Sequence, residues 1–471
     1  MKRAILKIIF IFLSLFSFAQ SKLTLQQCIE TGIANNQQVL QTELQRQTAK
    51  VNLKQARVNM FPNLNGNASQ GINQGRSIDP FTNGYTNQQT TVASYGLNSG
   101  VLLFNGLSIQ NNIKQNAFAY EASKMDWQQA KDNLTINIIL AYLQVLNSED
   151  IMEQSRNQLE VSRKQVERLE VLNKQGAISP SQLSDLKGQF AGDELSIISA
   201  QNSLESSKIS LCQLMNVPYS KDMQLERISM ETVASKYETT PDSIYQTALQ
   251  QFALIKASRW RVRSAEKNVK ALRGNLFPSL SLNGGVNTNY SSAAQKAIFL
   301  NTTDVSTSSY VIVSGNHVPV FVPQNNYSSQ KIGYSSQLGN NVSSYVSLNL
   351  TIPIFNSFQA RNRVTIAKID LKNSELADKT TKTQLQQEIE QAHLNMTTAF
   401  DRYKTLLEQV NAYEESFRAA QIRFDSGLGT SVDYLIAKNN LDRANISLIS
   451  AKYDYVLRMK ILDYYQGKQL W

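Results

Sequence analysis

The fold is decided by residues 134–169, which read LTINIILAYLQVLNSEDIMEQSRNQLEVSRKQVERL. Apolar residues recur there every seven positions, with mostly small residues between them, and this spacing predicts a helix that supercoils left-handedly with its neighbours. A solvated coiled-coil stalk would show the same pattern, so the pattern alone assigns no function. The main series is Ile138, Val145, Met152, Leu159 and Val166, and the interleaved series is Leu134, Ala141, Ser148, Ser155, Ser162 and Leu169.

The predicted helix is unusually long. No Gly or Pro occurs over the 69 residues from Leu107 to Gln175, nor over the 73 residues from Ile354 to Ser426. At a rise of 1.5 Å per residue, each stretch would form a helix of roughly 100 Å, which is far longer than the average globular helix. Shorter helices are predicted at 36–60, 179–215, 252–276 and 430–466, and the two short helices of each half, placed end to end, would nearly match one long helix.

The chain contains an internal repeat. Residues 25–66 align with 241–282 at an offset of 216, and later residues align at an offset of 251, so the second copy contains an insertion of 35 residues. The repeats predict two structural units, 20–215 and 241–471, joined by a linker at 216–240. Matching pairs include Phe61-Pro62 with Phe277-Pro278, and Phe104-Asn105 with Phe355-Asn356.

Between the helices the periodicity changes to two, which indicates β-strands. Four strands are predicted near 62–72, 92–104, 279–290 and 344–353, in pairs that span 62–104 and 278–353, and each pair starts after a Phe-Pro dipeptide. Long helical hairpins follow at 107–215 and 357–466, and the inserted stretch 291–340 is predicted to be a loop. Apolar residues on one face and small polar residues on the other are typical of membrane barrel strands, although a half-buried soluble sheet reads the same way.

The N-terminus indicates export. Three basic residues precede an apolar run that ends near Ala19, so residues 1–19 are predicted to be a secretory signal peptide. An exported protein meets no chromosome, and the formal charge of +10 is therefore no argument for nucleic-acid binding. No later segment is apolar enough for a membrane-spanning helix, so a membrane would have to be crossed by strands. A closed membrane barrel needs about eight strands or more, so several chains would have to share one barrel.

Few chemically reactive residues are present. The chain has two His and two Cys, which argues against metal centres and Cys/His catalysis, and no cofactor is predicted. Cys28 and Cys212 both fall among apolar helical positions, which favours two buried free thiols, although an oxidising periplasm would permit a disulfide. His317 and His393 have no nucleophile or metal-ligand spacing near them, so an exported enzyme is a weak alternative.

The ordered set of features resembles the TolC family of outer membrane efflux proteins. It includes Leu23-Thr24-Leu25 at the start, the two Phe-Pro dipeptides, the Phe-Asn motifs that end at Gly106 and Ser357, and the duplicated hairpins. The resemblance implies a mainly α fold with a β part: a homotrimer in which each chain gives four strands to a twelve-stranded outer membrane β-barrel, continued by a periplasmic α-helical barrel. It also implies a passive duct for small molecules, which works with a periplasmic adaptor and an inner membrane transporter.

The resemblance also implies functional positions at the helix tips. The turns at Gly176, Ala177 and Ser179 and at Gly427, Leu428, Gly429 and Thr430 would face the adaptor, although glycine and a capping hydroxyl also simply end one helix and start the next. Asp433 lies where the family has an acidic residue at the tunnel entrance, and an Asp there could equally be a helix cap. Phe424, Gly429 and Gln182 occupy the positions of the family's usual Tyr, Arg and acidic latch, which therefore cannot be carried over.

Two functional alternatives remain open from sequence. The same duct could serve a secretion system that exports a protein, because a wide polar tunnel selects little by itself. A coiled-coil protein of the cell surface would explain the long helices, but it would leave the duplicated strand pairs and the Phe-Pro dipeptides without a role.

Overall fold

The computed structural model describes residues 22–78, 83–87, 89–228 and 237–468. The predicted signal peptide, 1–19, and part of the predicted linker at 216–240 lie outside these ranges. The chain divides into two compact units, which are treated separately below. Of the described residues, the helical unit comprises 22–53, 115–228, 237–266 and 369–468, and the strand unit comprises 54–78, 83–87, 89–114 and 267–368.

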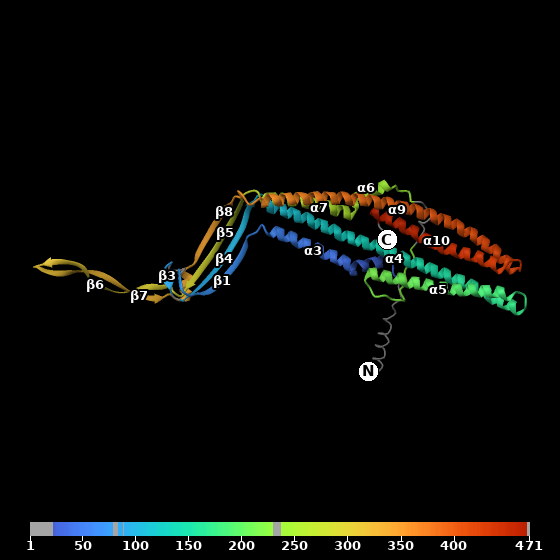
Figure 1. Cartoon of the computed structure of the whole chain (residues 1–471), viewed down its shortest axis with the longest axis horizontal. Coiled ribbons are helices and arrows are strands. Elements are labelled where there is room, and N and C mark those ends of the chain that lie inside the picture. Colours follow the sequence, from blue (N-terminus) through green and yellow to red (C-terminus); the bar gives the residue numbers. More distant parts are fainter. Residues whose placement is uncertain (1–21, 79–82, 88, 229–236, 469–471) are drawn as a thin grey trace, which may run out of the picture. The chain divides into compact units, whose positions relative to one another are not determined.

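The helices repeat in the same order in both halves of the chain (Figure 1). Helices α4 and α9 have 67 residues each, so each is roughly 100 Å long. Within the described residues, no helix combines the length and apolarity needed to cross a membrane. The first half contains α2 (Leu25–Asn35), α3 (Gln37–Val58), α4 (Ser108–Lys174) and α5 (Pro180–Met215), and the second half contains α6 (Pro241–Gln251), α7 (Ala253–Gly274), α9 (Gln359–Asp425) and α10 (Ser431–Tyr465).

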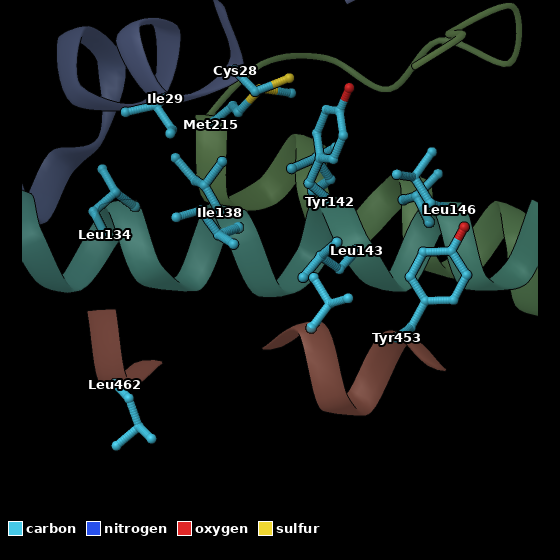
Figure 2. Packing of buried hydrophobic residues seen from close by; sticks show 14 of the residues in the cluster. Cys28, Ile29, Leu134, Ile138, Tyr142, Leu143, Leu146, Met215, Tyr453 and Leu462 are labelled. Atoms are coloured by element: carbon cyan, nitrogen blue, oxygen red, sulfur yellow. The ribbon is translucent and has the colours of Figure 1, made fainter. Parts of the chain in front are cut away.

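The heptad residues form the core of the helical unit. Ile138, Val145, Ile389 and Met396 have no exposed surface. Figure 2 shows Ile138 and Leu134 of α4 close to Ile29 of α2. Burying a side chain of this size stabilises the fold by roughly 1.5–3 kcal/mol. The residues of the predicted heptad pattern therefore lie in the core that several helices share.

The short helices of each half meet end to end, as the sequence predicts. In the first half, the Asn36 side chain donates a hydrogen bond of 3.1 Å to the carbonyl of Leu214, and the Asn216 side chain donates one of 3.2 Å to the carbonyl of Asn35. In the second half, the ring of Phe252, at the start of α7, lies 5.2 Å from the ring of Tyr464, near the end of α10. Polar capping in one repeat is thus replaced by aromatic packing in the other.

Both cysteines are buried free thiols, which confirms the expectation from sequence. Burial is the main cause that raises the pKa of Cys28 to about 11, and electrostatic repulsion from the neighbouring Cys212 adds to it. The Cys212 thiol lies 3.9 Å from the sulfur of Met223. The two residues therefore act as packing residues in the apolar core.

The strand unit contains a four-stranded antiparallel sheet in the order β1-β4-β5-β8 (Figure 1). Its register pairs Leu97 with Val286, and Ser279 with both Asn105 and Thr351. The four chain segments that connect to helices therefore all leave from one end of the sheet. The strands are β1 (Asn63–Asn73), β4 (Thr90–Asn105), β5 (Ser279–Ser291) and β8 (Ser343–Thr351), close to the four predicted ones.

The prediction of a loop at 291–340 was wrong. This stretch forms a long hairpin of β6 (Gln295–Val313) and β7 (Asn316–Lys331), followed by the short helix α8 (Tyr334–Asn340). Ser314 and Gly315, at φ 51° and 86°, form a two-residue turn of the kind that matches strand twist. The high proportion of Val, Ile, Thr and Tyr favours strands here. In the corresponding place of the first half, the described residues form the short strands β2 (Arg76–Ile78) and β3 (Tyr85–Asn87).

The two junctions where a strand ends and a long helix begins share an uncommon backbone conformation. Gly106 and Leu107 have φ values of 62° and 64°, and their counterparts in the repeat, Ser357 and Phe358, have 52° and 59°. Left-handed backbone costs a non-glycine residue roughly 1–2 kcal/mol. The structure thus explains why the first repeat has a glycine here, and it shows that the second repeat retains strain at Ser357.

Replacing Ser357 with glycine should relieve this strain. We expect Ser357→Gly to be about 1 kcal/mol more stable than Ser357→Ala, because only glycine is unstrained at positive φ. Thermal unfolding of the purified protein, followed by circular dichroism, measures the difference. Equal stability of the two variants would contradict the assignment of strain to this residue.

Candidate functional site at the helix tips

The first tip is the turn between α4 and α5. Gly176 has φ 72°, its N–H donates to the carbonyl of Asn173 at 3.0 Å, and the N–H of Ala177 donates to the carbonyl of Leu172 at 2.9 Å. This pair of bonds ends a helix through a left-handed residue. Ser179 then caps α5 by accepting a hydrogen bond from the N–H of Gln182. The exposed turn residues therefore follow directly from helix termination.

The second tip, between α9 and α10, has the same construction. Gly427 has φ 74°, and the N–H groups of Leu428 and Gly429 donate to the carbonyl of Arg423 at 2.8 and 3.0 Å. Gly429 approaches the helix closely, since a Cβ there would lie 3.1 Å from the backbone nitrogen of Phe424. Leu428 is 84% exposed, which leaves an apolar side chain at the outermost part of the turn.

Asp433 is an exposed residue of the first turn of α10, and its side chain takes part in the helix cap. Its N–H donates to the Thr430 hydroxyl oxygen at 3.1 Å, and that hydroxyl donates to the Asp433 carboxylate at 2.8 Å. The negative charge also lies at the positive end of the helix dipole. Within one chain, Asp433 therefore has the capping role that the sequence offered as one of two interpretations.

Phe424 and Gln182 are less exposed than Asp433. Phe424 is only 9% exposed, and its ring stacks on that of Tyr434 with centroids 5.1 Å apart. The two rings form a small apolar cluster with Leu169 and Leu186. Gln182 is half-buried beside its capping bond to Ser179. Within the chain, Phe424 therefore packs the two hairpins together at the tip.

An ion pair that no sequence pattern indicates joins the two long helices near the tip. Arg168 of α4 forms an ion pair with the Asp425 carboxylate, and its second guanidinium nitrogen donates to the Asp425 carbonyl at 3.0 Å. Nearby, the Ser431 hydroxyl donates to the carboxylate of Asp185 at 2.9 Å. These partners are about 250 residues apart in sequence, so no local pattern could indicate them.

A buried charged cluster lies further along the same helices. Lys438 of α10 is 2% exposed, and its ammonium lies 3.0 Å from Asp193 of α5 and 2.7 Å from Asp442. Ser162 of α4 also donates a hydrogen bond to Asp193. Burial raises the pKa of Asp442, while the charge of Lys438 opposes the increase. This charged cluster links the first hairpin to the second through buried ion pairs and hydrogen bonds.

The described residues contain no group of three or more His, Cys, Asp or Glu side chains arranged to hold a metal ion. The tips instead combine exposed turns, a small apolar cluster and charged links between hairpins. The chain is thus built from two repeats, each with a strand pair and a long helical hairpin.

The chain belongs to the outer membrane efflux protein family, whose model matches residues 28–217 and 244–463. It is 23% identical to the outer membrane protein TolC of Vibrio cholerae over 425 residues, which cover 90% of this chain and 86% of the relative. It is 18% identical to the outer membrane efflux protein BepC of Brucella suis over 375 residues, which cover 78% and 70% of the two chains. The expected family and the outer membrane location are thereby confirmed.

Solved structures show the same fold. The outer membrane protein VceC of Vibrio cholerae superposes with a TM-score of 0.74 at 16% identity, covering 94% of this chain and 96% of the other. The outer membrane channel CmeC of Campylobacter jejuni also gives 0.74 at 16% identity, covering 95% and 87%. The predicted fold class, mainly helical with a β part and internally duplicated, is confirmed.

Proposed function

We propose that three copies of this chain form the exit duct of a tripartite efflux system, which passively conducts small molecules from a periplasmic adaptor and an inner membrane transporter to the outside. The sheet supports this most directly. Strands β1 and β8 form its edges, and within the described part of the chain neither edge has a further partner strand. Pairing β8 of one copy with β1 of the next would satisfy both edges, and three copies would close a twelve-stranded barrel.

The exposed tips supply the contact with the adaptor in this proposal. The turns around Gly176, Ala177 and Ser179 and around Gly427, Leu428, Gly429 and Thr430 lie at the end of their helices, and Leu428 offers an exposed apolar side chain for contact. Asp433 gives the duct its acidic entrance. Three Asp433 carboxylates near a threefold axis would attract cations and disfavour anions. Phe424 stabilises the tip that carries this carboxylate by stacking on Tyr434, and Gln182 belongs to the cap of the neighbouring tip.

Single-channel recording in a planar bilayer tests both parts of the proposal. The mature wild-type protein should be trimeric and should give cation-selective currents. Asp433→Asn should reduce the preference for cations severalfold, whereas Asp433→Glu, which keeps the charge, should retain it. Helix capping predicts no such difference in selectivity.

The outcomes separate the duct from its entrance. A monomeric protein without current would overturn the duct. Normal trimeric currents whose selectivity is the same in Asp433→Asn would leave the duct in place and remove Asp433 from the entrance.

A further inference from the structure

The helical parts of the strand unit are strongly and uniformly basic. These parts, 54–60, 106–114, 267–276 and 353–368, contain no Asp or Glu; the nearest acidic residues next to them in sequence, Glu266 and Asp370, lie outside the ranges. We call their nine basic residues the junction cations, because all four segments connect to the same end of the sheet. The junction cations are Lys54, Arg57, Lys114, Lys267, Lys270, Arg273, Arg361, Arg363 and Lys368.

In the part of the chain that the structure describes, the junction cations are without ion-pair partners. Eight of them are exposed and Lys267 is half-buried. Among the described residues, none of the nine forms an ion pair, although ion pairs are frequent elsewhere in the chain. From residue 20 onward the chain has 44 Lys and Arg against 37 Asp and Glu, so nine uncompensated cations account for more than its whole positive excess. Their charge is therefore available to an anionic partner from outside the chain.

Exposed apolar side chains accompany these charges at the junctions. Phe61 is 69% exposed, Phe277 58% and Phe355 74%, while Ile354 reaches 94%. Aromatic and apolar side chains beside cations are typical of the boundary between lipid tails and headgroups. Exposing these apolar side chains to water would be unfavourable. The junctions therefore have the two components of a membrane-interface site, which are basic residues and exposed apolar side chains.

One groove combines the two components directly. It has a volume of about 350 Å³, and its lining combines apolar residues with two amides and one cation: Leu276, Pro353, Ile354, Phe355, Phe358, Asn275, Asn356 and Arg361. The Arg361 guanidinium lies 5.7 Å from the centre of the Phe358 ring, and the residue is exposed. A guanidinium can bind a phosphate through two parallel hydrogen bonds. The groove therefore offers a cation for a phosphate and neighbouring apolar side chains for an attached hydrocarbon chain.

We propose that the junction cations bind the phosphate groups of anionic phospholipids in the periplasmic leaflet of the outer membrane, with an acyl chain against the exposed apolar side chains. This inference rests on the proposed duct, which places the roots of the strands at that leaflet. Basic residues close to an anionic membrane surface each contribute to binding, and the contribution is screened by salt. Lipid binding at the junctions would fix the depth at which the sheet enters the membrane.

The test uses the full mature protein in nanodiscs that contain equal amounts of phosphatidylglycerol and phosphatidylcholine. After mild extraction, native mass spectrometry counts the lipids that remain bound. The wild type should retain phosphatidylglycerol preferentially. The variant Arg361→Gln/Arg363→Gln/Lys368→Gln should lower this preference by roughly tenfold or more, since each charge contributes about fivefold. The control Lys372→Gln/Lys379→Gln/Arg402→Gln removes three charges from the same helix outside the junction and should retain the preference.

The possible results are distinct. Loss of preference in the junction variant alone supports the proposal, and equal retention by both variants overturns it. Competition by inorganic phosphate at low concentration would show a general anion site and would also overturn it. Currents in phosphatidylcholine bilayers provide the second measurement. If both variants conduct but neither prefers phosphatidylglycerol, the proposed lipid site is wrong and the duct stands. If the wild type gives no current, the duct itself is wrong.

Discussion

Replacing Lys438 with alanine is expected to lower the free energy of unfolding by about 3–5 kcal/mol. The substitution leaves Asp193 and Asp442 facing a buried site without the ammonium that lies 3.0 and 2.7 Å from them. Two carboxylates at a largely desolvated site repel each other, and Asp193 is buried away from water. Thermal unfolding at pH 7 measures the loss.

The deficit of Lys438→Ala should shrink in acid. In the wild type, burial raises the pKa of Asp442 above its ordinary value of 3.8, and Lys438 opposes this shift. Without Lys438 the pKa of Asp442 should rise further. A carboxyl group with a raised folded-state pKa binds its proton more tightly in the folded state, so stability increases as the pH falls through that pKa towards 3.8. A pH-independent deficit would contradict this explanation.

The internal repeat provides a matched control at an offset of 251 residues. Lys187 of α5 is the counterpart of Lys438, but its ion pair with Glu170 is solvent-exposed, with side-chain exposures of 52% and 42%. Exposed pairs contribute about 0–1 kcal/mol. Lys187→Ala should therefore cost less than 1 kcal/mol. Similar losses for both lysines would mean that burial of the charged cluster is not the cause.

The second large effect is expected at the junction of strand and helix. In Gly106→Ala, the new Cβ would lie 2.4 Å from the carbonyl oxygen of Gly274, and φ is 62°. In Gly274→Ala, the Cβ would lie 2.8 Å from the carbonyl oxygen of Gly106. Backbone atoms cannot rotate away as a side chain can, so we expect a loss of about 3 kcal/mol or more from strain and overpacking. Yield of folded protein and thermal unfolding measure it.

Two helical glycines of α5 serve as controls. Gly188 and Gly192 have no atom within 4 Å of an added Cβ. Alanine at either position should stabilise the helix by about 0.5–1 kcal/mol, because glycine has more conformational freedom to lose on folding. If Gly106→Ala and Gly274→Ala behaved like these controls, the close approach of the two backbones would not matter for stability.

The long helices and the four strands of the sheet could be predicted because their signals are local. Heptad residues such as Ile138 and Ile389 follow the helical period, and the alternation that ends at Thr351 follows the period of a strand. The inserted hairpin was missed because its alternation is interrupted by register shifts near Phe299 and Ser306. The stretch was therefore predicted as a loop, although its residues favour strands.

The candidate site was predictable only in part. The glycine turns at Gly176 and Gly427 and the caps at Ser179 and Thr430 follow from rules that act within a few residues. The burial of Phe424 against Tyr434 does not, because it depends on how α9 packs on α10. The same holds for Arg168 and Asp425, whose helices are far apart in sequence.

The sequence by itself determined the helices, the strands of the sheet, the internal repeat and the turns, because periodicity, capping and backbone preference act over short distances along the chain. Only the tertiary structure decided which residues at equivalent positions of the two repeats have different environments. Lys438 is buried between two carboxylates while its counterpart Lys187 remains in solvent, and the junction cations come together from four separate segments. Burial and charge environment depend on residues distant in sequence, and these contacts exist only once the chain has folded.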